Sequence, residues 1–143
     1  MESLVKIQNA NLLIDVFGRF PSFHDAEVLR ITLDRGVRTH FDPSLEALIH
    51  VFEPTPEVDE SGHYRLKNHV LVLFRFSKIV NLQLTDFNQQ NVLWDLEIIH
   101  LSDRERDKVK FKVVFRSSFG VSASFHCEAV SIESVEPYVR KVS

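Results

Sequence analysis

The N-terminal segment of the sequence has the spacing of an amphipathic helix. Apolar residues recur there at intervals of three and four positions, namely Ile7, Ala10, Ile14 and Phe17. This spacing places them on one face of an α-helix. Ser3 can serve as the N-cap, Gly18 is placed to end the helix, and Pro21 prevents it from resuming. The pattern therefore predicts one N-terminal helix whose apolar face needs a surface to cover.

From Phe23 onward the period of the apolar positions changes to two, which indicates β-strands. In residues 28–33 the alternating apolar set is Leu29, Ile31 and Leu33. In residues 45–52 it is Leu45, Ala47, Ile49 and Val51. In residues 80–85 it is Val80, Leu82 and Leu84, which we expect to face inward. A further strand is predicted at residues 92–101, and residues 54–62 are predicted to form an acidic loop because of their prolines and Gly62.

Two other patterns are more specific. Residues 70–76 (VLVLFRF) are apolar on both faces, which predicts a central strand between the helix and the rest of the core. Residues 109–116 and 121–127 alternate around a turn at residues 117–120, so they predict an antiparallel hairpin. Its return strand places Val121, Ala123, Phe125 and Cys127 on one face. A last extended segment is predicted at residues 129–135.

Strands joined by short turns, with one helix, predict an α+β fold in which the helix packs on a largely antiparallel β-sheet of about seven or eight strands. A chain of 143 residues has the length of one domain, so we expect a single domain spanning residues 1–143. The apolar fraction is 44% and the charged fraction 26%, and the twelve phenylalanines can supply a large buried area. This composition is typical of a globular protein with its own core.

The charge and the cysteine content exclude several classes of function. The net charge is −3 and no run of Lys or Arg is present, which argues against nucleic-acid binding. Cys127 is the only cysteine, which rules out an internal disulfide and a cysteine metal cluster. No stretch reaches the ~20 apolar residues that span a bilayer, and the N-terminus lacks the pattern of a signal peptide. We therefore expect a cytoplasmic protein with no membrane partner.

The densest polar cluster lies between the helix and the first strand, in the sequence Phe23-His24-Asp25-Ala26-Glu27. A histidine and two carboxylates this close together could ligate a divalent metal or supply an acid–base pair. In an extended chain, however, only Asp25 and Glu27 point to the same face. A structural interpretation is that Asp25 or Glu27 accepts backbone N–H groups at the turn and His24 joins that network. Contact with a partner protein is a third interpretation, and all three remain open at this point.

The remaining reactive residues form no recognisable catalytic motif. The seven histidines include no HxH or HxxxH pair, and His50 and Glu53 lie three apart in a predicted strand, hence on opposite faces. Cys127 belongs to the apolar set of its strand, which indicates a buried thiol. The sequence contains neither a GxSxG motif nor a glycine-rich phosphate loop. No catalytic residue, bound metal or cofactor is therefore predicted.

The segment Phe87-Asn88-Gln89-Gln90-Asn91 places four consecutive amides between two predicted strands. Amides can satisfy backbone groups in such a connection, and they can also make adaptable contacts with a partner. Asn88, Gln90 and Asn91 are therefore candidate binding residues with a structural alternative. The polar outer face of the last hairpin likewise has two interpretations, a solvated face or a docking surface.

These segments together resemble the immunity protein 50 family of small bacterial proteins. Residues 20–28 (FPSFHDAEV) are similar to the family signature W/F-P-S-F-H-D-A-E-V/I, with Phe20 where many members have Trp. The similarity continues through residues 50–53, 87–93, 117–120 and 134–137, and covers nearly all of the chain after the predicted helix. The resemblance implies a cytoplasmic protein that binds and neutralises the cognate toxin of a bacterial polymorphic toxin system. It implies neither an enzyme nor a cofactor.

Two hypotheses of different class follow. The first is a non-catalytic protein-binding module of the toxin-immunity kind. This hypothesis is also compatible with a homo-oligomer. Its candidate binding residues are His24, Asp25, Glu27, Glu53, Asn88, Gln90 and Asn91. The second is a small metal-binding protein or metal-dependent enzyme that uses His24, Asp25 and Glu27 with a distant histidine such as His50.

Overall fold

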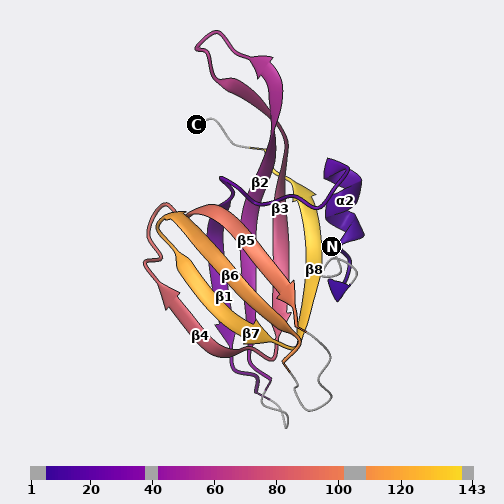
Figure 1. Cartoon of the computed structure of the whole chain (residues 1–143), viewed down its shortest axis with the longest axis vertical. Helices are drawn as coiled ribbons and strands as arrows, with labels where there is room; N and C mark the ends of the chain where they lie inside the picture. Colours follow the sequence, from indigo (N-terminus) through magenta and orange to yellow (C-terminus); the bar gives the residue numbers. More distant parts are fainter. Residues whose placement is uncertain (1–5, 38–41, 102–108, 140–143) are drawn as a thin grey trace.

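The computed structural model describes residues 6–37, 42–101 and 109–139 of the chain. Eight strands form one sheet in the order β4-β7-β6-β5-β1-β2-β3-β8, and every neighbouring pair is antiparallel (Figure 1). A short helix, α2, contacts the edge strand β8. The predicted α+β fold and antiparallel sheet are therefore confirmed. The elements are α2 (Asn11–Phe17), β1 (Glu27–Asp34), β2 (Ser44–Val58), β3 (Tyr64–Ser77), β4 (Val80–Thr85), β5 (Val92–His100), β6 (Phe111–Phe119), β7 (Ser122–Cys127) and β8 (Ala129–Pro137).

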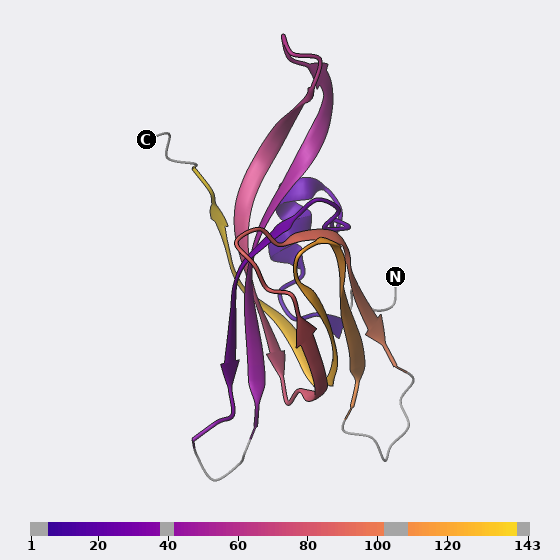
Figure 2. The ribbon, with the colours of Figure 1, turned by 90° about the vertical axis from the view of Figure 1, so that its left-hand side faces the viewer.

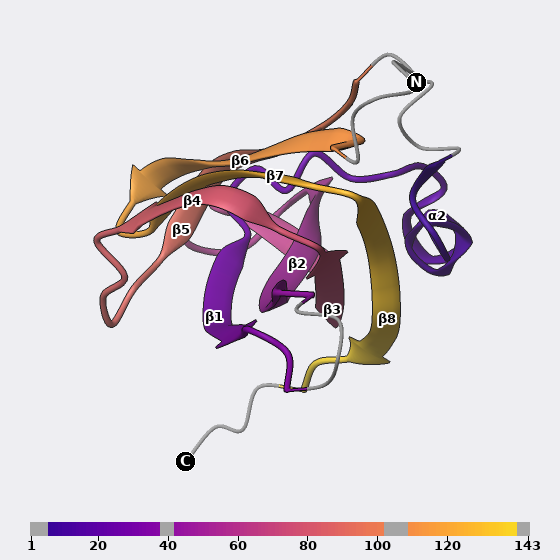
Figure 3. The ribbon, with the colours of Figure 1, turned by 90° about the horizontal axis from the view of Figure 1, so that it is seen from below.

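The sheet curls back on itself and encloses the core (Figure 3). Phe76 of β3 packs against Phe125 of β7, with ring centroids 5.0 Å apart, and against Phe115 of β6 at 6.1 Å. In the order of the sheet, β5, β1 and β2 separate β3 from β6, so this contact spans the curl. Phe76, Phe115 and Phe125 are all almost completely buried. The phenylalanine-rich core therefore lies between the two halves of one sheet.

The prediction of a central position for residues 70–76 is wrong. They lie in β3, which is second from the end of the sheet and pairs with β2 and β8. Val72, Phe74 and Phe76 are buried in the core, whereas Leu71 and Leu73 on the opposite face are only half-buried. The helix covers β8 instead of β3. An apolar set on both faces here reflects one buried face and one partly covered face.

The helix is shorter than the spacing predicts. It begins at Asn11 and ends as expected at Gly18, which adopts the left-handed conformation (φ 75°) and donates its N–H to the Ile14 oxygen at 2.7 Å. Its buried residues are Leu13 and Phe17. The predicted N-cap, Ser3, lies outside the described residues.

Residues that precede the helix pair with the edge of β8. Gln8 forms a parallel bridge with Ser131: its N–H donates to the Val130 oxygen and its oxygen accepts from the Ile132 N–H, both at 2.9 Å. The Asn9 side chain donates to the Ile132 oxygen at 3.1 Å. These bonds satisfy groups that an edge strand would expose, and they pair Gln8 with β8 although the apolar spacing of this segment is helical.

A β-bulge in β1 shifts the alternation that the sequence predicts. The pairing with β2 changes register between Val28 and Arg30, so Val28 and Ile31 both face the core, opposite Ile49 and Ala47. Leu29 occupies the bulge and is 39% exposed. Leu33 is 52% exposed at the end of the strand. The predicted apolar set Leu29, Ile31 and Leu33 is therefore not the buried set of this strand, because a bulge exchanges the two faces.

Strands β2 and β3 continue past the sheet as a projecting arm, residues 53–67 (Figures 1 and 2). Most of the predicted loop at residues 54–62 is therefore strand, and only its tip is a turn. At this tip the Asp59 carboxylate accepts the N–H groups of Ser61 and His63 at 2.9 and 3.0 Å. The two prolines are tolerated because this part of the arm lies outside the continuous sheet.

At the other edge of the sheet, β4 buries less than predicted. Leu82 and Leu84 are half-buried against the core, but Val80 is 43% exposed, so the prediction that it faces inward is wrong. The final hairpin, in contrast, is confirmed: Val121, Ala123, Phe125 and Cys127 are all buried. The pairing of β6 with β7 leaves their opposite face polar.

The turn between β6 and β7 generates a first prediction. A Cβ on Gly120 would overlap the Gln90 backbone oxygen and lie 2.8 Å from Asn91 Oδ1, and Gly120 has a φ of 82°. Gly62 has nearly the same φ, 84°, with no atom within 4 Å of its Cβ position. Replacing Gly62 with Ala should therefore cost about 1 kcal/mol from backbone strain alone. Gly120→Ala should cost clearly more in urea unfolding, and equal losses would contradict the close packing.

Cys127 generates a second prediction. Its side chain is fully buried, and burial raises the pKa of its thiol to about 12 from an ordinary value of 9.0. The thiolate is the reactive form, so the folded protein should not react with a disulfide reagent at pH 8, whereas the unfolded protein should. Rapid labelling of the native protein would contradict this burial.

The same shift predicts the sign of a pH effect. The thiol ionises at a lower pH in the unfolded chain than in the fold, so its contribution to stability is complete below about pH 9 and is lost as the pH rises toward 12. Urea unfolding at pH 8 and pH 10 measures this loss. Cys127→Ala, which has no thiol to ionise, should lose less stability between the two pH values.

Candidate functional site

One row of paired residues crosses six strands on the face of the sheet opposite the core. Glu27 of β1 stands at its centre, because it pairs with both Val92 of β5 and His50 of β2. Paired residues project from the same face of a sheet. The complete row is Phe119, Val92, Glu27, His50, Leu71 and Glu136. Five of these residues belong to the five separate segments that resemble the immunity protein family, so the fold brings those segments together.

A cavity of about 290 Å³ lies beside this row at the base of the arm, and we call it the acidic cavity. It contains two carboxylates, those of Asp25 and Glu27, and no Lys or Arg side chain among its lining residues. The full lining is Asp25, Glu27, His50, Phe52, Leu66, His69, Gln90, Val92 and Tyr138. The concave shape and the convergence of several polar groups make it the candidate binding site.

A second hollow of about 390 Å³ adjoins the acidic cavity, and we call it the side hollow. The two share Asp25, Phe52 and Leu66 in their walls. Glu53 and Arg19 also line the side hollow. The Glu53 carboxylate accepts a hydrogen bond from the Asn68 side chain at 2.9 Å, which links the two strands of the arm at its base.

The Phe23–Glu27 segment is held so that its polar residues face these hollows. Phe23 and Ala26 are buried, and they anchor the segment in the core. The Asp25 N–H donates to the Leu93 oxygen at 2.9 Å, and the Leu93 N–H donates to the Ala26 oxygen at 2.8 Å. Phe23 and Asp25 both have positive φ angles, 67° and 65°, which is unusual for a bulky aromatic residue. This tight turn places His24 and Asp25 outward.

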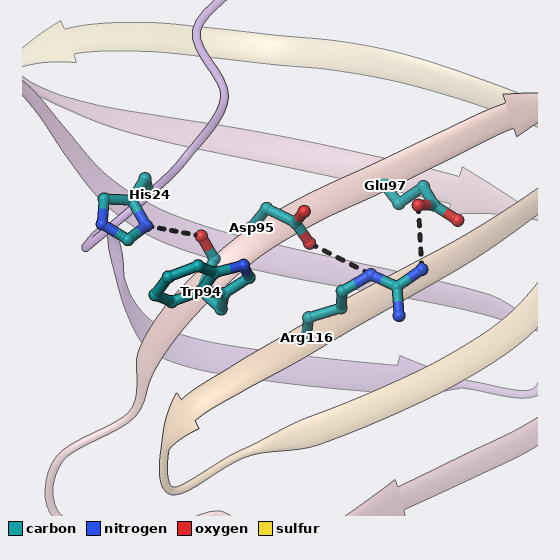
Figure 4. A network of polar contacts seen from close by, with 5 residues as sticks. All are labelled: His24, Trp94, Asp95, Glu97 and Arg116. Atoms are coloured by element: carbon teal, nitrogen blue, oxygen red, sulfur yellow. Dashed lines mark hydrogen bonds and ion pairs between the residues drawn. The ribbon is translucent and has the colours of Figure 1, made fainter.

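His24 contacts β5 (Figure 4). Its Nδ1 lies 2.8 Å from the Trp94 backbone oxygen, and its ring stands edge-on to the Trp94 ring at 4.7 Å. Its Nε2 lies 3.7 Å from the Asp25 carboxylate. The hydrogen bond of the His24 ring is therefore made to a strand 70 positions along the chain. Within the described residues the Asp25 carboxylate pairs with His24 rather than with a backbone N–H, so the network expected at the turn is not formed as predicted.

An ion-pair network connects β5 and β6 on their outer face next to Trp94 (Figure 4). Arg116 donates from Nη2 to the Glu97 carboxylate at 2.9 Å, and its Nε lies 3.4 Å from the Asp95 carboxylate. The hydrogen bond and the charge of Glu97 raise the pKa of Arg116 above its ordinary value. Arg116, one of the basic residues on this hairpin face, is therefore already paired with β5.

A pair of histidines forms one wall of the acidic cavity. His50 Nε2 and His69 Nδ1 lie 2.9 Å apart, with their rings nearly stacked. Such a hydrogen bond needs one N–H and one lone pair, so at least one of the two rings is neutral while it persists. Tyr138 stands edge-on to His50 at 4.5 Å, and Phe52 lies 5.5 Å from both histidine rings. These four rings form a continuous aromatic wall.

Sequence reasoning missed His69, Tyr138, Phe52 and Leu66 as site residues. His69 and His50 are 19 positions apart and meet only because β2 pairs with β3. Tyr138 follows β8, and its N–H donates to the His69 oxygen at 3.0 Å. No local sequence motif predicts either contact, because both depend on which strands are neighbours in the sheet.

The metal hypothesis has no support in the arrangement of side chains. Among the residues that the structure describes, no group of three or more His, Cys, Asp or Glu side chains could hold a metal ion. His24 turns toward Trp94, whereas Glu27 lies in the row beside His50. The three residues proposed as ligands are therefore not brought together.

The amide segment divides into a structural part and an exposed part. Asn91 is buried, and its Oδ1 accepts the N–H groups of Asn88 at 2.8 Å and of Val121 at 3.1 Å. Its Nδ2 donates to the Asn88 oxygen at 2.8 Å. Asn88 is exposed and bonds locally to the Asp86 oxygen, whereas Gln90 lines the acidic cavity. Of the three amides, Gln90 alone combines exposure with a place in this cavity.

A third prediction compares Asn91 with Asn88. Asn91→Ala removes the acceptor of two backbone N–H groups and should lower the free energy of unfolding by about 2–6 kcal/mol, since each unsatisfied group costs about 1–3 kcal/mol. Asn88→Ala removes one exposed side-chain bond and should cost less than about 1 kcal/mol. Urea unfolding of both variants measures the difference. Similar losses would show that Asn91 does not hold this junction together.

Comparison with known proteins gives one family. A family described as Immunity protein 50 matches residues 9–138 of the chain. No curated protein and no solved structure matches it. Within the described residues, no helix has the length and apolar character needed to cross a bilayer. The matched region contains every strand of the sheet together with the acidic cavity, and the chain belongs to the immunity protein 50 family.

Proposed function

We propose that this protein neutralises a cognate toxin by binding it, without catalysis and in the cytoplasm. Membership of an immunity protein family supports binding to a toxin. The binding surface that we propose is the corner between the arm and the sheet, which contains the acidic cavity and the side hollow. The observation that supports this choice is the row centred on Glu27, in which segments far apart in the sequence meet at one concave surface.

The chemistry of this corner favours a protein partner with a basic patch. Asp25, Glu27 and Glu53 place three carboxylates around the two hollows. Apolar side chains such as Phe52 and Leu66 lie between them and can be covered by a partner. Apolar contact area surrounded by charged groups is typical of specific protein interfaces, in which charge complementarity guides association.

The candidate residues have different roles in this proposal. His24, Asp25, Glu27, Glu53 and Gln90 would contact the partner, because each lines one of the two hollows. Asn91 would act indirectly, by holding the segment that positions Gln90. Asn88 lines neither hollow and would stabilise the same segment.

A fourth prediction tests the surface by charge reversal. The double variant Asp25→Lys and Glu53→Lys should raise the Kd for the toxin about 100-fold or more, because like charges then face each other across the interface. Asp42→Lys is the matched control: Asp42 is exposed and precedes the opposite end of β2. Isothermal titration with the purified cognate toxin domain gives the Kd, and growth of cells that co-express both proteins measures protection.

The outcomes separate the function from its location. A wild-type protein that neither binds the toxin domain nor protects cells from it would contradict the proposed function. A double variant that binds and protects as well as the wild type would leave the function intact and place the interface elsewhere. Weakened binding by Asp42→Lys to the same extent would indicate a general charge effect instead of a local surface.

A further inference from the structure

We propose that the acidic cavity receives an arginine side chain of the bound toxin, an inference that rests on the proposed function. The partner group is identified by the charge, the rings and the size of the cavity. Each of these properties is independent of the match to the family.

The charge of the cavity selects a cation. Asp25 and Glu27 are its two carboxylates, and its lining includes no Lys or Arg side chain that neutralises them. The hydrogen bond between His50 and His69 keeps at least one of those rings neutral. The cavity therefore has a negative charge that a basic side chain can balance. The side hollow differs in this respect because Arg19 lies in its wall.

The rings of the cavity favour a guanidinium group over an ammonium group. His50, Phe52, His69 and Tyr138 form one aromatic wall, with centroids 4.5–5.5 Å apart. A guanidinium group is planar and stacks on aromatic faces, while its N–H groups bond to carboxylates on its edge. An ammonium group is compact and strongly hydrated, and gains less from such a wall. Asp25 and Glu27 supply the acceptors for the edge of the guanidinium group.

The size of the cavity favours a single side chain. Its volume of about 290 Å³ lies at the lower end of the about 300–1,000 Å³ that is usual for small-molecule sites. It adjoins the side hollow, with which it shares Asp25, Phe52 and Leu66 as lining residues. A side chain can therefore enter the acidic cavity while the chain to which it belongs passes over the side hollow. Buried arginines of this kind are frequent hot spots of protein interfaces.

The test uses amino-acid derivatives as probes for the isolated side chain. The full-length protein, labelled with nitrogen-15, is titrated with Nα-acetyl-arginine amide, Nα-acetyl-lysine amide and Nα-acetyl-citrulline amide. Arginine should shift the amide resonances of Asp25, Glu27, His69 and Gln90 with a Kd in the millimolar range, lysine should bind more weakly, and citrulline should leave them unchanged. Citrulline has nearly the shape of arginine without its charge. Equal shifts with citrulline, or no shift with arginine, would overturn the inference.

Two variants connect the shifts to the cavity. Glu27→Gln keeps the size of the side chain and removes its charge, and should weaken arginine binding about fivefold or more. Tyr138→Leu removes one ring and should also weaken it, which provides a second measurement if the first variant folds poorly. Asp42→Asn, outside the cavity, should bind arginine as the wild type does. Unchanged binding by both cavity variants would place the arginine elsewhere and overturn the proposal.

Toxin binding by the same variants separates this inference from the proposed function. A toxin domain that binds wild type and Glu27→Gln with equal Kd would overturn the arginine inference and leave the proposed function intact. A fivefold or larger loss for Glu27→Gln, with no loss for Asp42→Asn, would support both. Failure of the wild type to bind the toxin domain would contradict the proposed function. It would also contradict the toxin as the source of the arginine, even if the arginine probe still bound the cavity.

Discussion

The contact of Phe76 with Phe115 and Phe125 across the curled sheet is the interaction on which the rest of the structure depends. It brings β3 against β6 and β7 although three strands separate them in the sheet. Each such aromatic pair contributes about 0.5–1.5 kcal/mol beyond the area that it buries. A flat sheet could not make these contacts, so the core requires the sheet to bend. Strands β1 and β5 both have shifts of register typical of β-bulges, and bulges increase local twist.

The bend has a direct consequence for the opposite face of the sheet. With one face of β1, β2 and β3 closed on the phenylalanine core, the other face presents Glu27, His50 and Leu71 side by side. The arm leaves the sheet immediately beyond this row and provides a second wall. The cavity is therefore formed where two neighbouring strands continue past the sheet, and the turn at Asp25, the connection at Gln90 and Tyr138 after β8 complete its lining. Six of its nine lining residues belong to strands, which favours a preformed site over one that closes on binding.

Polar residues near this corner serve two different purposes. Asn91 satisfies two backbone N–H groups inside the fold, and His24 bonds to the backbone of β5. The carboxylates of Asp25 and Glu27 accept no backbone hydrogen bond among the described residues, and both line the cavity. A buried amide contributes mainly by preventing the cost of unpaired groups, whereas an exposed carboxylate remains available to a partner. The same short segments of sequence thus contain both residues that stabilise the fold and residues of the proposed contact surface.

The local pattern of residue types along the chain was sufficient to predict the antiparallel strands, the final hairpin with its buried Cys127 and the end of the helix at Gly18, because these depend on neighbours in sequence. It also drew attention to Asp25, Glu27 and Gln90. It could not locate the bulge at Leu29, the bridge between Gln8 and β8 or the arm, since each depends on the partner strand or on its absence. For the same reason His69 and Tyr138 were missed. Local periodicity determines which residues form strands, but only the tertiary structure decides which strands are adjacent and hence which side chains form the cavity.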